Sequence, residues 1–170
     1  MIQVTSILVA FDFSDTSKSA LTYGRHLARA FGARLHVLHI ADVISTSAAQ
    51  FYPEGPGDPE AKASQLAMNQ LRSVITAEGI TDAQPAVRVA PDAAIEIVEY
   101  AKSNRTDLIV IGTHGRTGVS RFLMGSVAEH VVRTAPCPVL VVRPSEHEFV
   151  LPDPPSRAGS DSLRRDDSRT

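Results

Sequence analysis

Residues 108–115 read Leu-Ile-Val-Ile-Gly-Thr-His-Gly, and this stretch decides the fold. Its four apolar residues predict a buried strand, and the glycines that follow let the backbone turn tightly and approach a ligand closely. Nine residues separate Gly115 from Gly125 and Ser126, which stand at the predicted start of a helix. A helix N-terminus offers unpaired N–H groups and a partial positive charge, which suit a phosphate. The pattern predicts a nucleotide-binding loop; the alternative is that the glycines only shape a tight loop and let a helix pack closely.

Apolar runs and helical periodicities alternate along the rest of the chain. Continuous apolar runs such as residues 7–11 are typical of strands that are covered on both faces. Ser14 and Asp15 are candidate helix caps, and Gly32 fits the end of the helix that follows. The apolar faces of the predicted helices include Phe31, Leu66 and Ile95. We expect strands at 7–11, 35–40, 86–90, 107–111 and 138–142, with helices at about 14–31, 66–79, 91–101 and 125–134.

This alternation predicts an α/β fold with a doubly wound, five-stranded parallel sheet and helices on both faces. In the strand order 3-2-1-4-5, ligands bind where the order reverses, at the carboxyl ends of the first and fourth strands. That order places Asp12 beside Gly112, although about a hundred residues separate them in the sequence. A carboxylate there would accept hydrogen bonds from a ribose or a base edge. The alternative for Asp12 is a local Asx turn that caps the first helix.

Length, charge and cysteine content narrow the class of protein. A chain of 170 residues suits one domain with a sizeable core. The net charge of -2 gives no basic footprint for nucleic acid or an anionic membrane, and no apolar run reaches the roughly 20 residues of a membrane span. One cysteine permits no internal disulfide, which fits a reducing compartment. We therefore expect a cytoplasmic protein that binds neither nucleic acid nor membrane.

Several other kinds of site are disfavoured by the residues present. No lysine follows the glycines as a P-loop requires, and Asp12 stands where a dinucleotide fold has its first glycines. His36 and His39 lie on one strand at an odd separation, so their side chains should point to opposite faces and not share a metal ion. Cys137 is interpreted as a small packed side chain. We expect no catalytic residue and no metal-ligating residue in this chain.

The glycine signature is complete, and at this point the chain resembles the universal stress protein family. The resemblance covers about residues 4–144, and we expect a domain at 1–145. The tail at 146–170 has a composition that favours partial disorder, or else it docks on a dimer partner. The stretches that carry the resemblance are 7–14, 35–40, 106–118, 125–129 and 135–142, with the spacing G-x2-G-x9-G-[S/T] at Gly112, Gly115, Gly125 and Ser126.

The resemblance implies a protein that binds ATP, or ADP or AMP, together with Mg²⁺ and with little or no turnover. Asp12 would hold the adenosine, and Ile40 would line the adenine pocket. Ala90 stands near a position where many relatives carry a glycine. The implied nucleotide contacts are Ala10, Phe11, Asp12, Ile40, Ile111, Gly112, His114, Gly115, Arg116, Gly125, Ser126 and Val127.

The resemblance also implies a homodimer built by pairing fifth strands through Val139, Leu140, Val141 and Val142, an apolar edge that needs covering. The leading interpretation is a dimeric, nucleotide-dependent stress-response switch that acts on an unknown protein partner. Three alternatives stay open: a slow ATPase, a nucleotide-independent dimeric interaction module, and an adenylating enzyme of the same fold. The S-G-G-x-D-S type of loop that such enzymes carry after the first strand is missing from this sequence.

Overall fold

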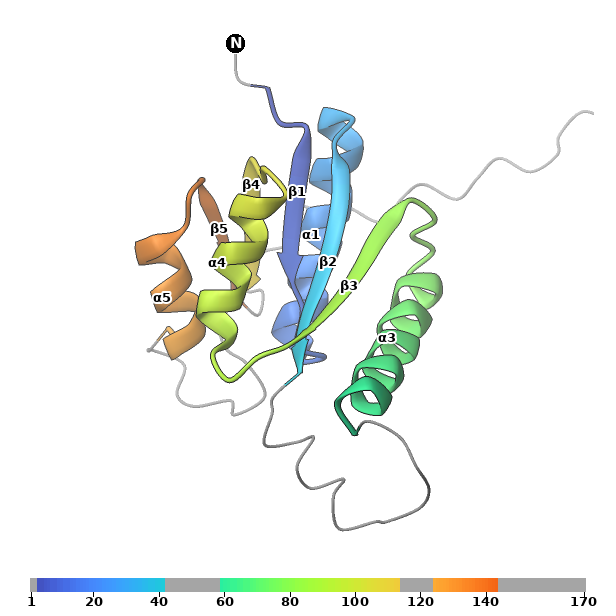
Figure 1. The fold of residues 1–170 in the computed structure, drawn as a ribbon. Helices are drawn as coiled ribbons and strands as arrows, with labels where there is room; N and C mark the ends of the chain where they lie inside the picture. The colour runs from blue at the N-terminus through green and yellow to red at the C-terminus, as the bar shows by residue number, and fades with distance from the viewer. Residues whose placement is uncertain (1–2, 42–58, 114–123, 144–170) are drawn as a thin grey trace, which may run out of the picture.

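In the computed structural model, which describes residues 3–41, 59–113 and 124–143, the strands form one parallel sheet. Its five strands lie in the order β3-β2-β1-β4-β5, which confirms the predicted fold (Figure 1). The elements are β1 Ser6–Ala10, α1 Asp15–Phe31, β2 Arg34–Ala41, α3 Pro59–Ala77, β3 Ala83–Val89, α4 Ala93–Ser103, β4 Leu108–Gly112, α5 Ser126–Thr134 and β5 Val139–Val142.

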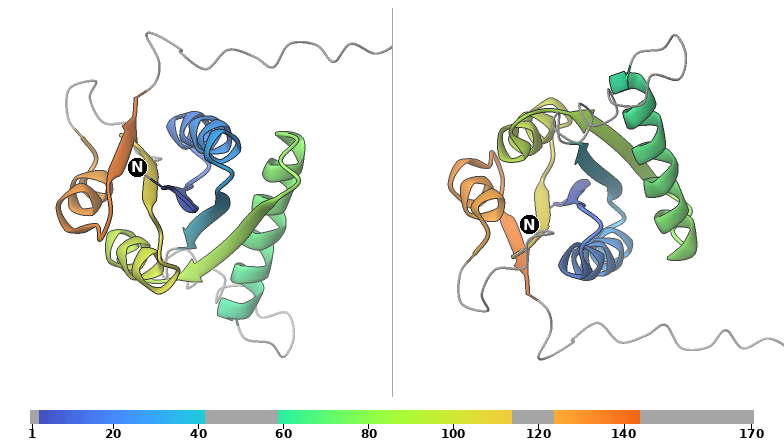
Figure 2. Two further views of the ribbon diagram at one scale, coloured as in Figure 1. Left: turned by 90° about the horizontal axis from the view of Figure 1, so that it is seen from above. Right: turned by 90° about the horizontal axis from the view of Figure 1, so that it is seen from below.

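The core has two halves, one on each face of the sheet. Successive side chains of a strand point to opposite faces, so Ile7 and Val9 pack with α1 and α3, whereas Leu8 and Ala10 pack with α4 and α5. Figure 2 looks along the strands and shows these two helix pairs on either side of the sheet. Every residue of β1 is buried because the strand lies at the centre of this sandwich.

The helix ends follow the capping residues that the sequence contains. Ser14 is the N-cap of α1, and its side chain accepts a hydrogen bond from the backbone N–H of Ser17. Gly32 ends the same helix in the left-handed region, at φ 64°, where glycine carries no steric penalty. Asp92 caps α4 and accepts from the N–H groups of Ala94 and Ile95.

Strand boundaries differ from the prediction by up to three residues, and α3 begins at Pro59 and not near residue 66; two of the strand differences have a clear physical reason. The strand β1 ends at Ala10 and not at residue 11, because Phe11 is buried without continuing the strand, and apolar character alone cannot separate the two cases. The strand β3 begins at Ala83 and not at residue 86, so it includes Pro85, which pairs with Val37. Proline has no N–H to donate, but β3 is an edge strand and tolerates it there.

Three side chains predicted on apolar faces are exposed instead. Phe31 is the last residue of α1 and Leu66 lies on α3, and their side chains are 49% and 62% exposed. Ile95 on α4 is 52% exposed. A helix turns by about 100° per residue, so Leu66 and Ile95 each sit one residue away from a buried stripe that begins at Ala67 and Ala94, respectively.

The two strand histidines point to opposite faces, as expected. Nδ1 of His36 lies 3.1 Å from the hydroxyl of Tyr100 on α4, whereas Nδ1 of His39 lies 2.8 Å from the carbonyl oxygen of Phe11. In the described part of the chain, no three His, Cys, Asp or Glu side chains gather as a metal site would require. None of the helices described in the structure is long and apolar enough to cross a membrane.

Candidate functional site

The carboxyl ends of β1 and β4 lie side by side at the lower edge of the sheet in Figure 1. Ala10 is in register with Ile111, and the N–H of Phe11 donates to the carbonyl of Leu38 at 2.8 Å. The sheet therefore brings together the predicted site residues of these two strands. Asp12 comes two residues after the end of β1, next to Phe11. Ile40 lies one strand away on β2, where its side chain packs on the α4–α5 side of the sheet.

The segment that carries the glycine signature is closed at its base by two backbone hydrogen bonds. The N–H of Thr113 donates to the carbonyl of Val142 at 2.8 Å, and the N–H of Gly125 donates to the carbonyl of Thr113 at 2.7 Å. The chain thus leaves the sheet at Thr113 and returns beside it at Gly125. The predicted contacts His114, Gly115 and Arg116 lie outside the described residues. Thr113 was not among the predicted contacts, because only the folded structure shows that it joins β4, β5 and α5.

The N-terminus of α5 begins at this closed base. Gly125 is its N-cap, with extended backbone angles and no side-chain hydrogen bond to the first turn. The side chains of Ser126 and Val127 are exposed at this end. By contrast, α1 and α4 start at the same edge with the side-chain caps Ser14 and Asp92. The first-turn N–H groups of α5 are therefore not capped by their N-cap side chain, an arrangement that suits an anion.

Asp12 takes part in a local turn before α1. Its Oδ1 accepts hydrogen bonds from the N–H of Ser14 at 3.0 Å and from the hydroxyl of Ser14 at 2.5 Å. The Asx turn that the sequence left as an alternative is therefore formed. A carboxylate offers about four acceptor directions, so the turn is compatible with a further contact to a ligand. Asp12 is half-buried beside the end of β4.

Gly112 packs against the first turn of α1. A Cβ added there would lie 3.0 Å from Cβ of Thr16 and 3.1 and 3.2 Å from its backbone carbon and oxygen. Close packing of α1 on β4 thus requires the absence of a side chain at this position. For Gly112 the packing explanation holds, and its part in binding a ligand stays a prediction.

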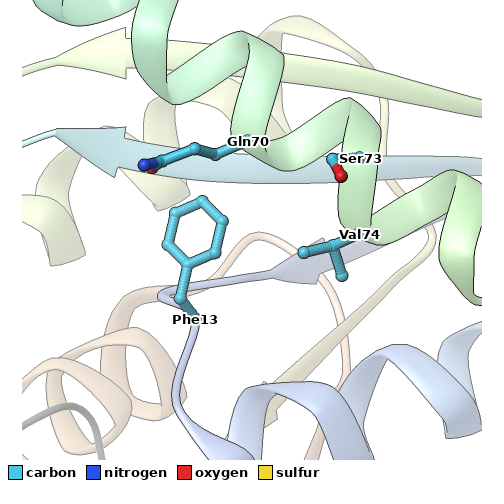
Figure 3. Close-up of a pocket in the computed structure, with 4 residues that line it drawn as sticks. All are labelled: Phe13, Gln70, Ser73 and Val74. Carbon is cyan, nitrogen blue, oxygen red and sulfur yellow. The ribbon is translucent and has the colours of Figure 1, made fainter.

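Phe13 is a residue of this edge that the sequence analysis overlooked. Its φ of 68° lies in the left-handed region, which is rare for a bulky residue. Its ring meets those of Phe11 and His39 edge-on and borders an open hollow of about 540 Å³ along α3, shown in Figure 3. The signal was present in the sequence: an aromatic residue stands between Asp12, which follows β1 and Phe11, and Ser14, which caps α1.

Two reactive side chains take no part in this edge. Cys137 precedes β5 and is half-buried, and burial raises the pKa of its thiol, which disfavours the reactive thiolate. Glu129, in the first turn of α5, is exposed, and its Oε1 lies 2.9 Å from Nη2 of Arg133 one turn later.

The chain matches known proteins over the described sheet and its helices. The model of the Universal stress protein family matches residues 4–143. A universal stress protein of Methanocaldococcus jannaschii is 33% identical over 144 residues, which are 84% of this chain and 84% of that protein.

The chain is also similar to solved structures of the same family, and two of them illustrate the likeness. The universal stress protein UspA from Lactobacillus plantarum is 27% identical with a TM-score of 0.65, over 84% of this chain and 100% of that one. A universal stress protein from Archaeoglobus fulgidus, in complex with dAMP, is 25% identical with a TM-score of 0.55, over 84% of this chain and 99% of that one. The family match spans most of the sequence, so this chain belongs to the universal stress protein family.

Proposed function

We propose that this chain binds an adenine nucleotide, with ATP as the first candidate, where β1, β4 and α5 meet. The observation that carries the proposal is the hydrogen bond from Gly125 to Thr113, which holds the start of α5 against the end of β4. The end of β1 lies beside this point. The complex of the Archaeoglobus fulgidus relative with dAMP supports a ligand of this class.

In this proposal the nucleotide lies across the carboxyl edge of the sheet. Asp12 accepts hydrogen bonds from the adenosine, beside Ala10 and Phe11, and Ile40 lines the adenine pocket. The phosphates lie at the N-terminus of α5, because its partial positive charge and N–H groups favour an anion there. The contacts on that side are Ile111, Gly112, His114, Gly115, Arg116, Gly125, Ser126 and Val127.

The oxygen donors proposed for this site also fit Mg²⁺. We expect no metal site formed by this chain alone, so Mg²⁺ would enter bound to the phosphates of the nucleotide, and the carboxylate of Asp12 and the hydroxyl of Ser126 are hard donors that would tolerate it there. Phosphoryl transfer needs positioned charge and an oriented water as well as binding. We propose binding with little or no turnover, with a slow ATPase as the second candidate.

The second copy of this chain is the proposed partner at β5. This strand is an edge of the sheet, and an edge presents backbone N–H and C=O groups that another strand can pair with. Val139, Leu140 and Val141 are only half-buried, whereas Val142 is buried. Thr113 hydrogen-bonds to Val142 and also to Gly125, so one residue connects the proposed phosphate site to the proposed dimer edge. Through this connection, nucleotide binding would shift the population of edge conformations that a protein partner meets.

Calorimetric titration of Mg-ATP into nucleotide-free protein tests the proposal. The wild type should bind with micromolar affinity, and Gly115→Val should abolish the heat. Asp12→Asn should weaken binding by about tenfold or more, because a hydrogen bond to a charged group is lost. Asp92→Asn is the matched control, since it makes the same chemical change at the N-cap of α4 on the same edge of the sheet and should bind as the wild type does. A folded wild-type protein that gives no heat would exclude nucleotide binding and favour the dimeric interaction module.

A further inference from the structure

Phe13 adopts a backbone conformation that its own side chain disfavours. Among the described non-glycine residues, only Phe13 and Arg105 have a positive φ, at 68° and 49°. A bulky residue in the left-handed region brings its Cβ too close to the backbone, and it stays there only when its surroundings hold it. Phe13 lies between Asp12 and the α1 cap Ser14, so its conformation sets how the carboxylate is presented.

The contacts of the ring identify what holds this conformation. The Phe13 ring lies edge-on to Phe11 at 5.2 Å and to His39 at 4.7 Å between centroids. Figure 3 shows it pointing toward α3, between Gln70 and Val74. It packs against the core half that contains Phe11, which is 2% exposed. The ring therefore ties the turn to Phe11, to His39 and to the core half that α1 and α3 share, and it borders the hollow along α3.

The backbone on the other side of Asp12 is fixed as well. The carbonyl oxygen of Phe11 can only accept a hydrogen bond, so Nδ1 of the buried His39 donates to it at 2.8 Å. Asp12 thus lies between Phe11, whose carbonyl is hydrogen-bonded to His39, and Phe13, whose ring packs against Phe11 and His39. Its Oδ1 is further fixed by the N–H and hydroxyl of Ser14.

We propose that Phe13 is a positioning residue for the nucleotide site: its ring, anchored on Phe11, His39 and α3, holds the carboxylate of Asp12 where the adenosine binds. This inference rests on the proposed function, in which Asp12 contacts the nucleotide. Phe13 itself acts through Asp12. Without the ring, the hydrogen bonds of Ser14 to Asp12 and of His39 to the carbonyl of Phe11 are left to oppose relaxation of the disfavoured φ, and we expect the turn to lose the geometry that binding requires.

A double-mutant cycle tests this role. Mg-ATP affinity is measured by calorimetry for the wild type, Phe13→Ala, Asp12→Ala and the double variant, with circular dichroism and thermal unfolding to verify folding. Phe13→Ala should weaken binding by about tenfold in the wild-type background. In the Asp12→Ala background the same change should have no further effect, because there is no carboxylate left to position. An equal loss in both backgrounds, or no loss in either, would overturn the inference.

Further variants separate the ring from the backbone conformation. Phe13→Gly fits the left-handed region but lacks the ring, so it should bind as weakly as Phe13→Ala. If Phe13→Gly binds like the wild type, φ alone matters and the anchoring role is wrong. Phe13→Tyr retains the ring and should restore affinity to within about twofold of the wild type, as a conservative rescue. Should Phe13→Ala fail to fold, Val74→Ala loosens the ring's contact from α3 and should weaken binding only when Asp12 is present.

The two proposals fail in different ways. A folded wild type that binds no adenine nucleotide overturns the proposed function, and the inference with it. Nucleotide binding that depends on Asp12 but is unchanged in the Phe13 variants overturns the inference alone.

Discussion

Gly24→Ala is the substitution whose effect the structure determines most directly. Gly24 lies on α1 where the helix crosses β1, and it is buried. A Cβ at this position would overlap Cγ2 of Val9 and lie 3.6 Å from Cδ1 of Leu35. Val9 has no exposed surface and sits on the central strand, so it has no space to move into.

Overpacking and helix propensity act in opposite directions on the free energy of unfolding of Gly24→Ala. Forcing an extra methyl into a well-packed core costs about 1–3 kcal/mol. Alanine is favoured over glycine inside a helix by about 1 kcal/mol. The overlap with Val9 is too deep to be relieved by small shifts, and the side chain of Val9 is stiff at χ1, so overpacking should lie near the top of its range. We expect Gly24→Ala to lower the free energy of unfolding by about 2 kcal/mol, which corresponds to a fall in Tm of about 4–8 °C at this chain length.

Urea and thermal unfolding followed by circular dichroism measure this effect. The same substitution is repeated in a Val9→Ala background, where Cγ2 is absent and Gly24→Ala should be neutral or stabilising. Ala30→Gly, at an exposed position in the last turn of α1, is the control for helix propensity alone and should cost less than about 1 kcal/mol, the value for a helix interior. A Gly24→Ala protein as stable as the wild type, or equal destabilisation in both backgrounds, would refute the packing argument.

Two further predictions concern Gly112 and His36. Gly112→Ala should lower the free energy of unfolding by about 1–2 kcal/mol, because the new methyl meets backbone atoms of Thr16 that cannot rotate away; an unchanged urea midpoint would contradict this. Burial, with a smaller contribution from Arg34, lowers the pKa of His36, so the unfolded chain takes up this proton at a higher pH than the folded protein does. The stability that neutral His36 contributes is therefore present above about pH 6.5 and is lost as pH falls through the lowered pKa of the folded state. Urea unfolding at pH 7.5 and 5.5 should show this loss in the wild type and a smaller one in His36→Phe, and equal losses would count against it.

The sheet and its strand order could be predicted because the apolar runs and helix-end residues gave the order of elements, and few parallel sheets fit that order. The helix α1 was marked by Ser14 and Gly32, which act within one turn and form the expected caps, whereas the start of α3 at Pro59 was not predicted. Alternating strands and helices then leave few parallel arrangements. The start of β3 was missed because proline disfavours a central strand, and Pro85 lies in its first half. An edge strand tolerates proline, but whether a strand lies at the edge of the sheet cannot be known from the local sequence.

The details of the candidate site depend on contacts that no local pattern encodes. Phe13 has a left-handed backbone conformation, and its ring meets that of His39 and borders a hollow along α3, both far away in the sequence. The closing bonds of Thr113 to Val142 and Gly125 likewise appear only once β4, β5 and α5 are assembled. The sequence could place Asp12 near Gly112, but it could not distinguish the turn that Asp12 forms from the ligand contact that it is proposed to make.

The glycine signature therefore combines two physical requirements that have to be tested at different positions. Gly112 is needed where it stands because α1 approaches β4 too closely for a side chain, whether or not a nucleotide binds. Loss of affinity in Gly112→Ala would follow from either cause, since a shift of the first turn of α1 also moves Ser14 and with it Asp12. Asp12→Asn preserves one oxygen that Ser14 can donate to, but it removes the charge and replaces the second acceptor oxygen by an NH2 donor, and Asp92→Asn reproduces that change at the cap of α4. A selective loss of Mg-ATP affinity in Asp12→Asn, at equal thermal stability of both variants, would support a contact between Asp12 and the ligand.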